Sequence, residues 1–184
     1  NIDDINTSIW NKICERLIHS KPKNSKERYI TKYKEFKHDQ NNEFHGILRY
    51  LTEETHGNIH DNGTIEITSN SIYDSSKNPK NLVNYRNSAC EYYSKETDGT
   101  NHIIVFDFKD KLIQLESYTI QSRDDSPNNV HLKNWVFEVS NNGNSDDWVI
   151  VDRRENDSTL NGCSIIHTFE VNQKKDGFYR YVRL

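Results

Sequence analysis

Hydrophobic and polar positions alternate most clearly in the stretch LKNWVFEVSNNGNSDDWVIVD, which ends at Asp152. From Trp135, every second residue is large and apolar for three positions, which is the period of a half-buried strand. Asn-Asn-Gly follows at 141–143, and these residue types tolerate positive φ and favour tight turns. The alternation resumes at Trp148. The pattern predicts two strands joined by a tight polar turn, with both tryptophans in the core rather than on the surface as sugar-stacking rings.

Similar alternation recurs along the chain, separated by clusters of Asn, Gly, Ser and Asp. It predicts seven strands in all, at 64–69, 103–108, 117–122, 135–140, 149–152, 165–171 and 179–184. Two long polar loops lie between them, at 70–84 and 122–133. Strands and helices do not alternate as they do in an α/β fold. The sequence therefore predicts an all-β fold, either a sandwich or a jelly roll.

Two segments before the strands have helical periodicity instead. Residues 8–18, SIWNKICERLI, carry their apolar residues on one face, and a shorter amphipathic helix begins within 43–52 and is stopped by the Gly, Asn and Asp residues of 55–63. Between them, 21–38 holds seven Lys or Arg residues against two Glu, a local charge of +5. We expect a solvated linker there, and contact with an acidic partner is the alternative.

These observations divide the chain at residue 42. Residues 1–42 form a helical extension and a basic linker, which we interpret as the tail of a preceding module. Residues 43–184 form the β-sandwich, and its last strand reaches Leu184 without a polar tail, so we expect the sandwich to be truncated at that end.

Composition and charge narrow the classes of function. Aromatic residues make up 11% of the chain, which argues against disorder although the mean hydropathy is −0.97. A net charge of −4 gives no general affinity for nucleic acid, and no apolar run reaches the length of about 20 residues that spans a membrane. The three cysteines have neither zinc-ligand spacing nor a disulfide framework, so we expect free thiols and a cytoplasmic location.

The sequence gives no specific support for catalysis. It contains no G-x-S-x-G elbow and no glycine-rich phosphate loop. The adjacent carboxylates at 124–125 and 146–147 are typical of solvated turns. His56 and His60 have Gly57 between them, so we expect turn-forming and hydrogen-bonding roles for them rather than a metal site. The charged run at 152–155, Asp-Arg-Arg-Glu, is interpreted as an exposed loop whose charges pair locally.

The stretch WVFEVSNNGNSDDWVIVDRREN resembles the central signature of the discoidin, or coagulation-factor type C, family within the galactose-binding-like superfamily. Three further stretches, 67–85, 103–123 and 167–184, resemble other parts of that family in the same order. The resemblance covers residues 58–184 and is closest to intracellular protist domains that follow BTB/BACK-like modules. It implies a jelly-roll β-sandwich.

The chain also departs from the family pattern. Secreted members usually tie their ends with a disulfide, and no cysteine pair sits at both ends here. The family's Asp-Gly after the first loop, which is sometimes part of a calcium site, is Asn84-Tyr85, and the following Trp-Ser is Tyr93-Ser94. Calcium requires several oxygen ligands. We therefore expect no cofactor. Calcium is the one cofactor whose binding remains an open alternative.

Binding usually concentrates on loops that a rigid sheet carries, and the resemblance places the two long loops at one end of the sandwich. The candidate ligand-binding residues are Tyr73, Asp74, Ser75, Ser76 and Lys77 on the first loop, and Arg123, Asp124, Asp125, Asn129 and His131 on the second. We expect a non-catalytic interaction domain that binds a protein partner within a larger intracellular protein. A carbohydrate-binding module is the alternative. Phospholipid binding is disfavoured because the loops lack apolar tips.

Overall fold

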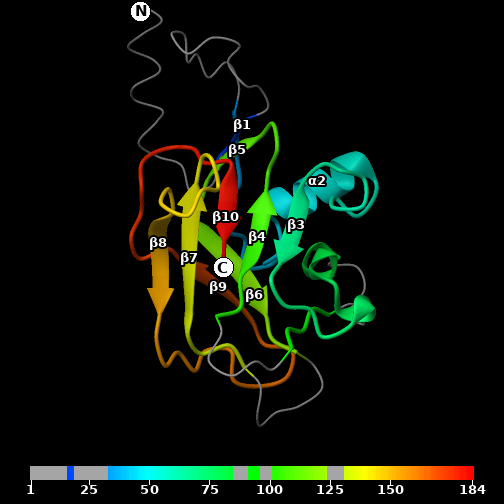
Figure 1. Cartoon of the computed structure of the whole chain (residues 1–184). Coiled ribbons are helices and arrows are strands. Elements are labelled where there is room, and N and C mark those ends of the chain that lie inside the picture. Colours follow the sequence, from blue (N-terminus) through cyan, green and yellow to red (C-terminus); the bar gives the residue numbers. More distant parts are fainter. Residues whose placement is uncertain (1–15, 19–32, 85–90, 96–100, 124–130) are drawn as a thin grey trace, which may run out of the picture.

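The chain folds into two layers of antiparallel strands with helix α2 packed beside them (Figure 1). The computed structural model describes residues 16–18, 33–84, 91–95, 101–123 and 131–184. One layer is a five-stranded sheet of order β3-β4-β10-β7-β8, and behind it lie the pair β6-β9 and the sheet β2-β1-β5. The elements are β1 (Arg16–Ile18), β2 (Tyr33–Glu35), α2 (Ile47–Thr55), β3 (Glu66–Ser69), β4 (Ile104–Asp107), β5 (Leu112–Gln114), β6 (Ser117–Gln121), β7 (Trp135–Ser140), β8 (Val149–Arg154), β9 (Ile166–Glu170) and β10 (Tyr181–Arg183).

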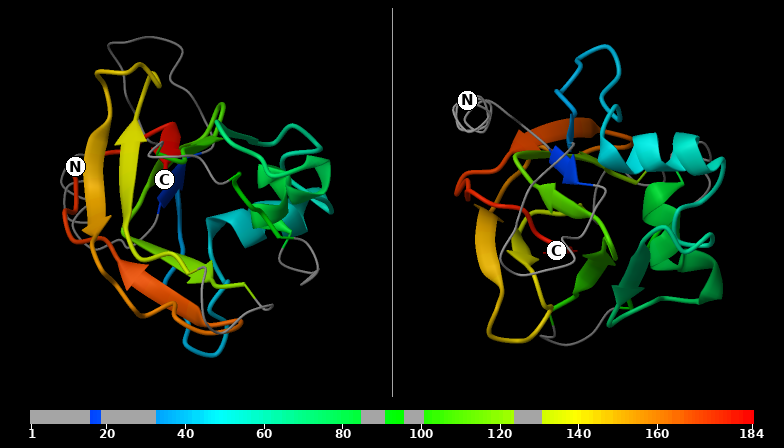
Figure 2. Two further views of the ribbon diagram at one scale, coloured as in Figure 1. Left: turned by 60° about the horizontal axis from the view of Figure 1, so that its bottom comes forward. Right: turned by 90° about the horizontal axis from the view of Figure 1, so that it is seen from above.

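All seven predicted strands are present, as β3, β4 and β6 to β10, which confirms the all-β prediction. The burial of β7 follows the predicted alternation, with Trp135, Phe137 and Val139 buried. The last strand, β10, lies in the middle of the five-stranded sheet between β4 and β7. Such a crossing connection brings distant parts of the chain together, as in a jelly roll (Figure 2).

The structure corrects part of the prediction for the N-terminal residues. The last three residues of the predicted helix form β1, which pairs with both β2 and β5; residues 8–15 lie outside the described ranges. The predicted solvated linker contains β2, and Phe36 just after it is only 4% exposed. Strands β1 and β2 have three residues each and lie in stretches without alternating apolar positions, so only the pairing reveals them. The division of the chain at residue 42 stays a prediction.

Helix α2 confirms the predicted amphipathic segment. Ile47 and Leu51 face the core, and the helix ends at His56, which adopts the left-handed conformation with φ 56°. His60 then accepts a hydrogen bond from the Ile67 amide at Nδ1, 3.0 Å away. Both histidines therefore have the turn and hydrogen-bonding roles expected of them. Within the described ranges, no helix is long and apolar enough to cross a membrane.

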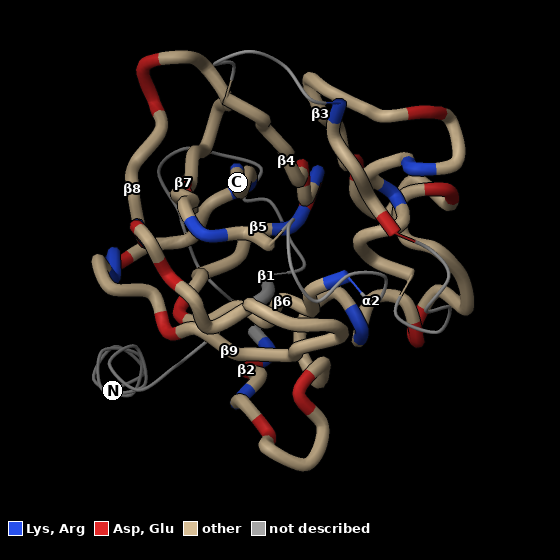
Figure 3. The backbone as a smooth tube through the Cα atoms, turned by 90° about the horizontal axis from the view of Figure 1, so that it is seen from below, with Lys and Arg blue, Asp and Glu red and all other residues tan. Residues whose placement is uncertain are grey.

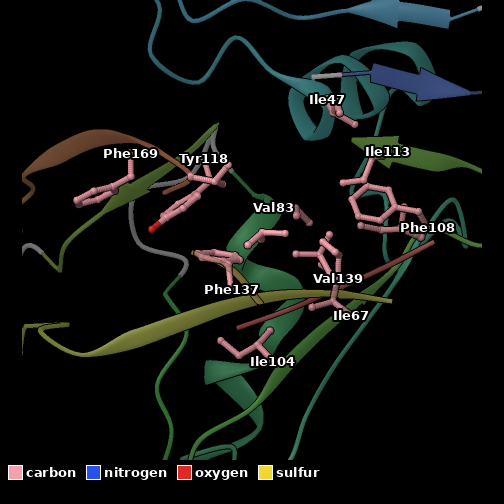
Figure 4. Packing of buried hydrophobic residues seen from close by; sticks show 14 of the residues in the cluster. Ile47, Ile67, Val83, Ile104, Phe108, Ile113, Tyr118, Phe137, Val139 and Phe169 are labelled. Carbon is pink, nitrogen blue, oxygen red and sulfur yellow. The ribbon is translucent and has the colours of Figure 1, made fainter. Parts of the chain in front are cut away.

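The core joins the two layers through aromatic side chains and a buried polar network. Tyr118 of β6 and Phe137 of β7 face each other, with ring centroids 4.1 Å apart (Figure 4). The Tyr118 hydroxyl accepts a hydrogen bond from Trp135 Nε1 at 2.7 Å and donates one to Asp152. Burial, and then the bond to Asp152, raises the pKa of Tyr118, so its hydroxyl remains a neutral donor.

The position of Asp152 corrects the prediction of an exposed charged loop at 152–155. Strand β8 continues to Arg154, and Asp152 is completely buried. The pairing of β7 with β8 shifts register between Phe137 and Glu138, so that Phe137 lies opposite Asp152 and Glu138 lies opposite Ile150. This bulge adds one residue to β8 and turns Asp152 from the outer face to the inner face of the sheet.

The same geometry leaves Trp148 outside the core, so the prediction for this tryptophan is wrong. Trp148 is half-buried, the Arg183 guanidinium lies 4.1 Å from its ring centroid, and Tyr181 meets it edge-on. The β7–β8 connection is also longer than the expected tight turn. Asp147 Oδ2 holds it by accepting hydrogen bonds from the hydroxyl of Ser140 at 2.7 Å and from two backbone amides, and the Ser140 hydroxyl contributes most to lowering the pKa of Asp147.

Gly143 is the residue of this connection that requires a left-handed backbone, with φ 73°. A Cβ atom there would lie 3.4 Å from the Tyr181 ring. We expect Gly143→Ala to destabilise the domain by about 1–2 kcal/mol, measured by urea unfolding. Gly57→Ala is the matched control, since nothing lies within 4 Å of its Cβ position. Equal unfolding midpoints for the two variants would contradict this geometry.

Candidate functional site

The first candidate loop, 70–84, is built from two short 3-10 helices, η2 (Ser75–Lys77) and η3 (Pro79–Val83). Asp74 caps η2, because its Oδ1 accepts hydrogen bonds from the Ser76 amide at 2.7 Å and the Ser76 hydroxyl at 2.6 Å. These bonds lower the pKa of Asp74, the hydroxyl contributing most. Asp74 therefore shapes the loop, and Ser75 and Ser76 lie exposed within it.

Tyr73 presents an exposed aromatic ring on the same loop. Its side chain is 59% exposed, the largest value among the exposed large hydrophobic residues of the described chain. Its amide donates to the Tyr93 carbonyl at 2.9 Å, which fixes the backbone beneath the ring. The ring itself remains available to a ligand.

Tyr93 brings the two candidate loops together. The Lys77 ammonium lies 4.5 Å from the centroid of the Tyr93 ring, and the Arg123 guanidinium lies 4.0 Å from it. Lys77 Nζ is also 3.6 Å from Glu91 Oε2, which accepts a hydrogen bond from the Tyr93 hydroxyl. We call Tyr73, Lys77, Glu91, Tyr93 and Arg123 the loop-end cluster.

The structure locates part of the second loop as well. The Arg123 carbonyl accepts from the Ser164 amide at 2.7 Å, and His131 Nε2 accepts from the Gly162 amide at 3.3 Å. These bonds fasten both ends of the loop to the segment before β9. The other candidates on this loop, Asp124, Asp125 and Asn129, lie outside the described residues.

Sequence reasoning missed Glu91 and Tyr93. Both lie in a segment without hydrophobic period, and only the tertiary contact with Lys77 and Arg123 reveals their place. One signal was present, because Tyr93 stands where the discoidin pattern has a tryptophan. The cluster offers two cations, one carboxylate and one exposed ring. In the part of the chain that the structure describes, no group of three or more His, Cys, Asp and Glu residues could hold a metal ion.

An open pocket of about 1340 Å³ lies beside the loop-end cluster. Glu91, Arg123 and His131 contribute to its polar rim. Core side chains of both layers border it and are themselves packed, since Ile113, Trp135 and Val182 are only 3–5% exposed. The same pocket also borders the charged side chains of Glu138 and Arg183.

The described chain is a jelly-roll β-sandwich. The solved structures that resemble it include a family 32 module from Clostridium perfringens, CpGH89CBM32-5, in complex with GalNAc-β-1,3-galactose. The two share a TM-score of 0.50 and 12% sequence identity, over 66% of this chain and 82% of that one. The family 32 module of Clostridium perfringens NanJ, in complex with galactose, gives a TM-score of 0.47 and 13% identity, over 66% and 80% of the two chains.

A chitosan-binding module from a Paenibacillus chitosanase/glucanase gives a TM-score of 0.42 at 16% identity, over 65% of this chain and 80% of that one. No protein-family model matches the chain, and no curated protein matches it. All three of these structures are named as carbohydrate-binding modules. The likeness to CpGH89CBM32-5, at a TM-score of 0.50 and 12% identity, establishes the fold alone.

Proposed function

We propose that this domain is a non-catalytic binding module that recognises galactose-containing carbohydrate at the loop-end cluster. The proposal is carried by the exposed Tyr73 ring, whose backbone amide is bonded to the Tyr93 carbonyl, together with the charged groups gathered around the Tyr93 ring. Aromatic rings present an apolar face against which the C–H face of a sugar can pack. Sites for small ligands combine such rings with a few convergent polar groups.

The members of the cluster have different roles in this proposal. Lys77 and Arg123 lie against the Tyr93 ring, so the stacking role falls to Tyr73. Arg123 and Lys77 are donors to sugar hydroxyl oxygens, and the Glu91 carboxylate is an acceptor. The capping bonds of Asp74 keep the Tyr73 loop in place before a ligand arrives. A site that is already ordered loses less conformational entropy on binding.

We expect Tyr73→Ala to reduce affinity for galactose-terminated glycans at least about tenfold, because stacking is worth about 1.4 kcal/mol or more. The measurement is a glycan array followed by calorimetric titration with methyl β-galactoside and with GalNAc-β-1,3-galactose, the ligand of the Clostridium module. Val149→Ala is the matched control, since Val149 is 39% exposed at the far edge of the five-stranded sheet. Unfolding temperatures should stay equal for both variants. An array without a galactose-containing binder, or full affinity in Tyr73→Ala, would refute the proposal.

A protein partner is the second candidate, and one observation favours it. Leu132, Ile165 and Ile166 are 36%, 36% and 38% exposed, and Ile165 is joined to the second loop by the bond from the Ser122 amide to its carbonyl. Exposed apolar side chains of this kind mark protein contacts when they gather. In this proposal the domain follows a BTB/BACK-like module in a cytoplasmic protein. Crosslinking in cells tests this second candidate. Ile166→Asp should abolish any crosslinked species in which the partner contacts this surface.

A further inference from the structure

The loop-end cluster brings two cations to one aromatic ring, so other contacts must hold its shape. Lys77 and Arg123 approach the Tyr93 ring to 4.5 Å and 4.0 Å from its centroid. Their like charges repel each other, and Glu91 offsets part of this repulsion at Lys77. Figure 3 shows basic and acidic residues interspersed along the described chain, so this pairing of cations is a local feature. The backbone segments that carry these side chains therefore need to be held side by side.

Asn81 joins two of those backbone segments through its side-chain amide. Its Nδ2 group donates to the Ser76 carbonyl at 2.7 Å and to the Glu91 carbonyl at 2.9 Å. Ser76 directly precedes Lys77, and Glu91 is itself a member of the cluster. The nitrogen of a side-chain amide carries two hydrogens. Asn81 therefore uses both of its donors to fasten the first loop to the segment 91–95.

The backbone of Asn81 is itself fixed within the fold. Asn81 lies in η3, where its amide donates to the Asn78 carbonyl at 3.0 Å and its carbonyl accepts from the Asn84 amide at 3.1 Å. Asn58 anchors the same short helix to the turn before β3, because its Nδ2 donates to the Lys80 carbonyl at 3.0 Å. The two side-chain bonds of Asn81 thus connect the loop-end cluster to a held element.

We propose that Asn81 is a positioning residue of the carbohydrate site, which holds the backbones at Lys77 and Glu91 together before the sugar binds. Asn81 acts through these two segments and does not contact the sugar. This inference rests on the proposed carbohydrate-binding function and adds a residue to the same site. The apparent affinity of a site falls with the fraction of molecules in which the site is formed. A bond that keeps the free loop in its binding conformation therefore strengthens binding.

Asn81→Ala removes both bonds and should lower the affinity for methyl β-galactoside about tenfold, measured by calorimetric titration. Asn172→Ala is the matched control, because it also removes two bonds between an asparagine side chain and the backbone. The Asn172 side chain donates to the Arg153 carbonyl at 2.9 Å and accepts from the Arg153 amide at 3.4 Å. Arg153 lies on β8, the edge strand opposite β3. Both variants should have similar unfolding temperatures, and Asn172→Ala should keep full affinity.

Hydrogen exchange, followed by NMR without ligand, separates positioning from general stability. The Tyr73 amide donates to the Tyr93 carbonyl across the same two segments, so its exchange rate reports whether they stay together. In Asn81→Ala this amide should exchange at least about tenfold faster than in Asn172→Ala, while the amides of β7 exchange equally in both. Asn81→Asp keeps the size of the side chain and loses both donors at neutral pH. It should behave as Asn81→Ala does, and it replaces that variant if the alanine chain unfolds.

The outcomes separate the two proposals. If Asn81→Ala binds methyl β-galactoside as tightly as Asn172→Ala does, the site does not depend on these bonds, and the inference fails while carbohydrate binding stands. If the affinity falls while the Tyr73 amide exchanges as before, Asn81 contacts the sugar itself and is not a positioning residue. If the unsubstituted chain binds no galactoside, the proposed function fails, and the role of Asn81 in it fails as well.

Discussion

Replacing Asp152 by alanine is expected to destabilise the domain by about 3–5 kcal/mol. Asp152 is completely buried and accepts hydrogen bonds from Tyr118, from Arg154 Nε at 2.9 Å and from the Asn172 amide at 3.0 Å. Removal of the carboxylate leaves three donors without their acceptor, and leaves the Arg154 guanidinium without its ion pair. The Tyr118 hydroxyl is then a buried donor without its acceptor, and such a group is among the most destabilising in proteins. Urea unfolding at neutral pH measures the effect.

Asp146→Ala is the matched control for this variant, because Asp146 is exposed on the β7–β8 connection. We expect its stability to change by no more than about 0.5 kcal/mol. The stability of Asp152→Asn should lie between those of the two alanine variants, since the amide keeps one acceptor oxygen and loses the charge. If Asp152→Ala and Asp146→Ala unfold at the same urea concentration, the buried network does not join the two layers.

Phe36→Ala is expected to destabilise the domain by about 3–5 kcal/mol. Phe36 is 4% exposed, and its ring lies 5.3 Å from that of Tyr50 on α2. The Lys34 ammonium lies 3.5 Å from the centroid of the Tyr50 ring and strengthens the same contact. The ring therefore attaches β2 to the rest of the fold. Thermal and urea unfolding of the whole chain measure the loss.

Lys37→Ala is the control, because the Lys37 side chain is 74% exposed. We expect Lys37→Ala to have the same unfolding midpoint as the unsubstituted chain. The comparison distinguishes two views of residues 33–38, which the charge pattern predicts to be a solvated linker and the structure places in part in the core. If Phe36→Ala unfolds like Lys37→Ala, the solvated linker is the correct description.

Most of the strands that could be predicted are long enough to show a period, and the three-residue strand β10 was predicted because it lies within the longer apolar-rich stretch 179–184. Strands β7 and β9 have six and five residues, and their side chains alternate between the faces of a sheet. The missed strands β1, β2 and β5 have three residues each and depend on partners far away in the chain. Such pairing is a tertiary property, and three residues carry no period to indicate it.

The errors around β8 have one physical cause. Trp148, Ile150 and Asp152 alternate along the sequence, which predicts one shared face. The bulge opposite Phe137 adds a residue to β8, so that Asp152 turns inward while Trp148 stays outside beside Arg183. A bulge of one residue reverses the face of every position beyond it. Nothing in the hydrophobic pattern records the insertion.

The candidate site was predictable as a region rather than as a set of contacts. Loop length and polarity indicated both loops, and Lys77 and Arg123 do meet at one place. Their common partner Tyr93 was missed, because the segment around it has no regular period and its match to the tryptophan of the discoidin pattern was the one signal. Asp74 was expected to contact ligand, which stays a prediction, and the structure shows that it also caps a 3-10 helix.

The most direct test of the central claim is a backbone NMR titration of the domain with methyl β-galactoside. Binding at the loop-end cluster predicts that the largest chemical-shift changes occur at Tyr73, Lys77, Glu91, Tyr93 and Arg123. The β7–β8 connection at the other end of β7, with Trp148, should remain unchanged. Shift changes centred on Trp148, or none at any residue at millimolar sugar, would contradict a carbohydrate site at the loop-end cluster.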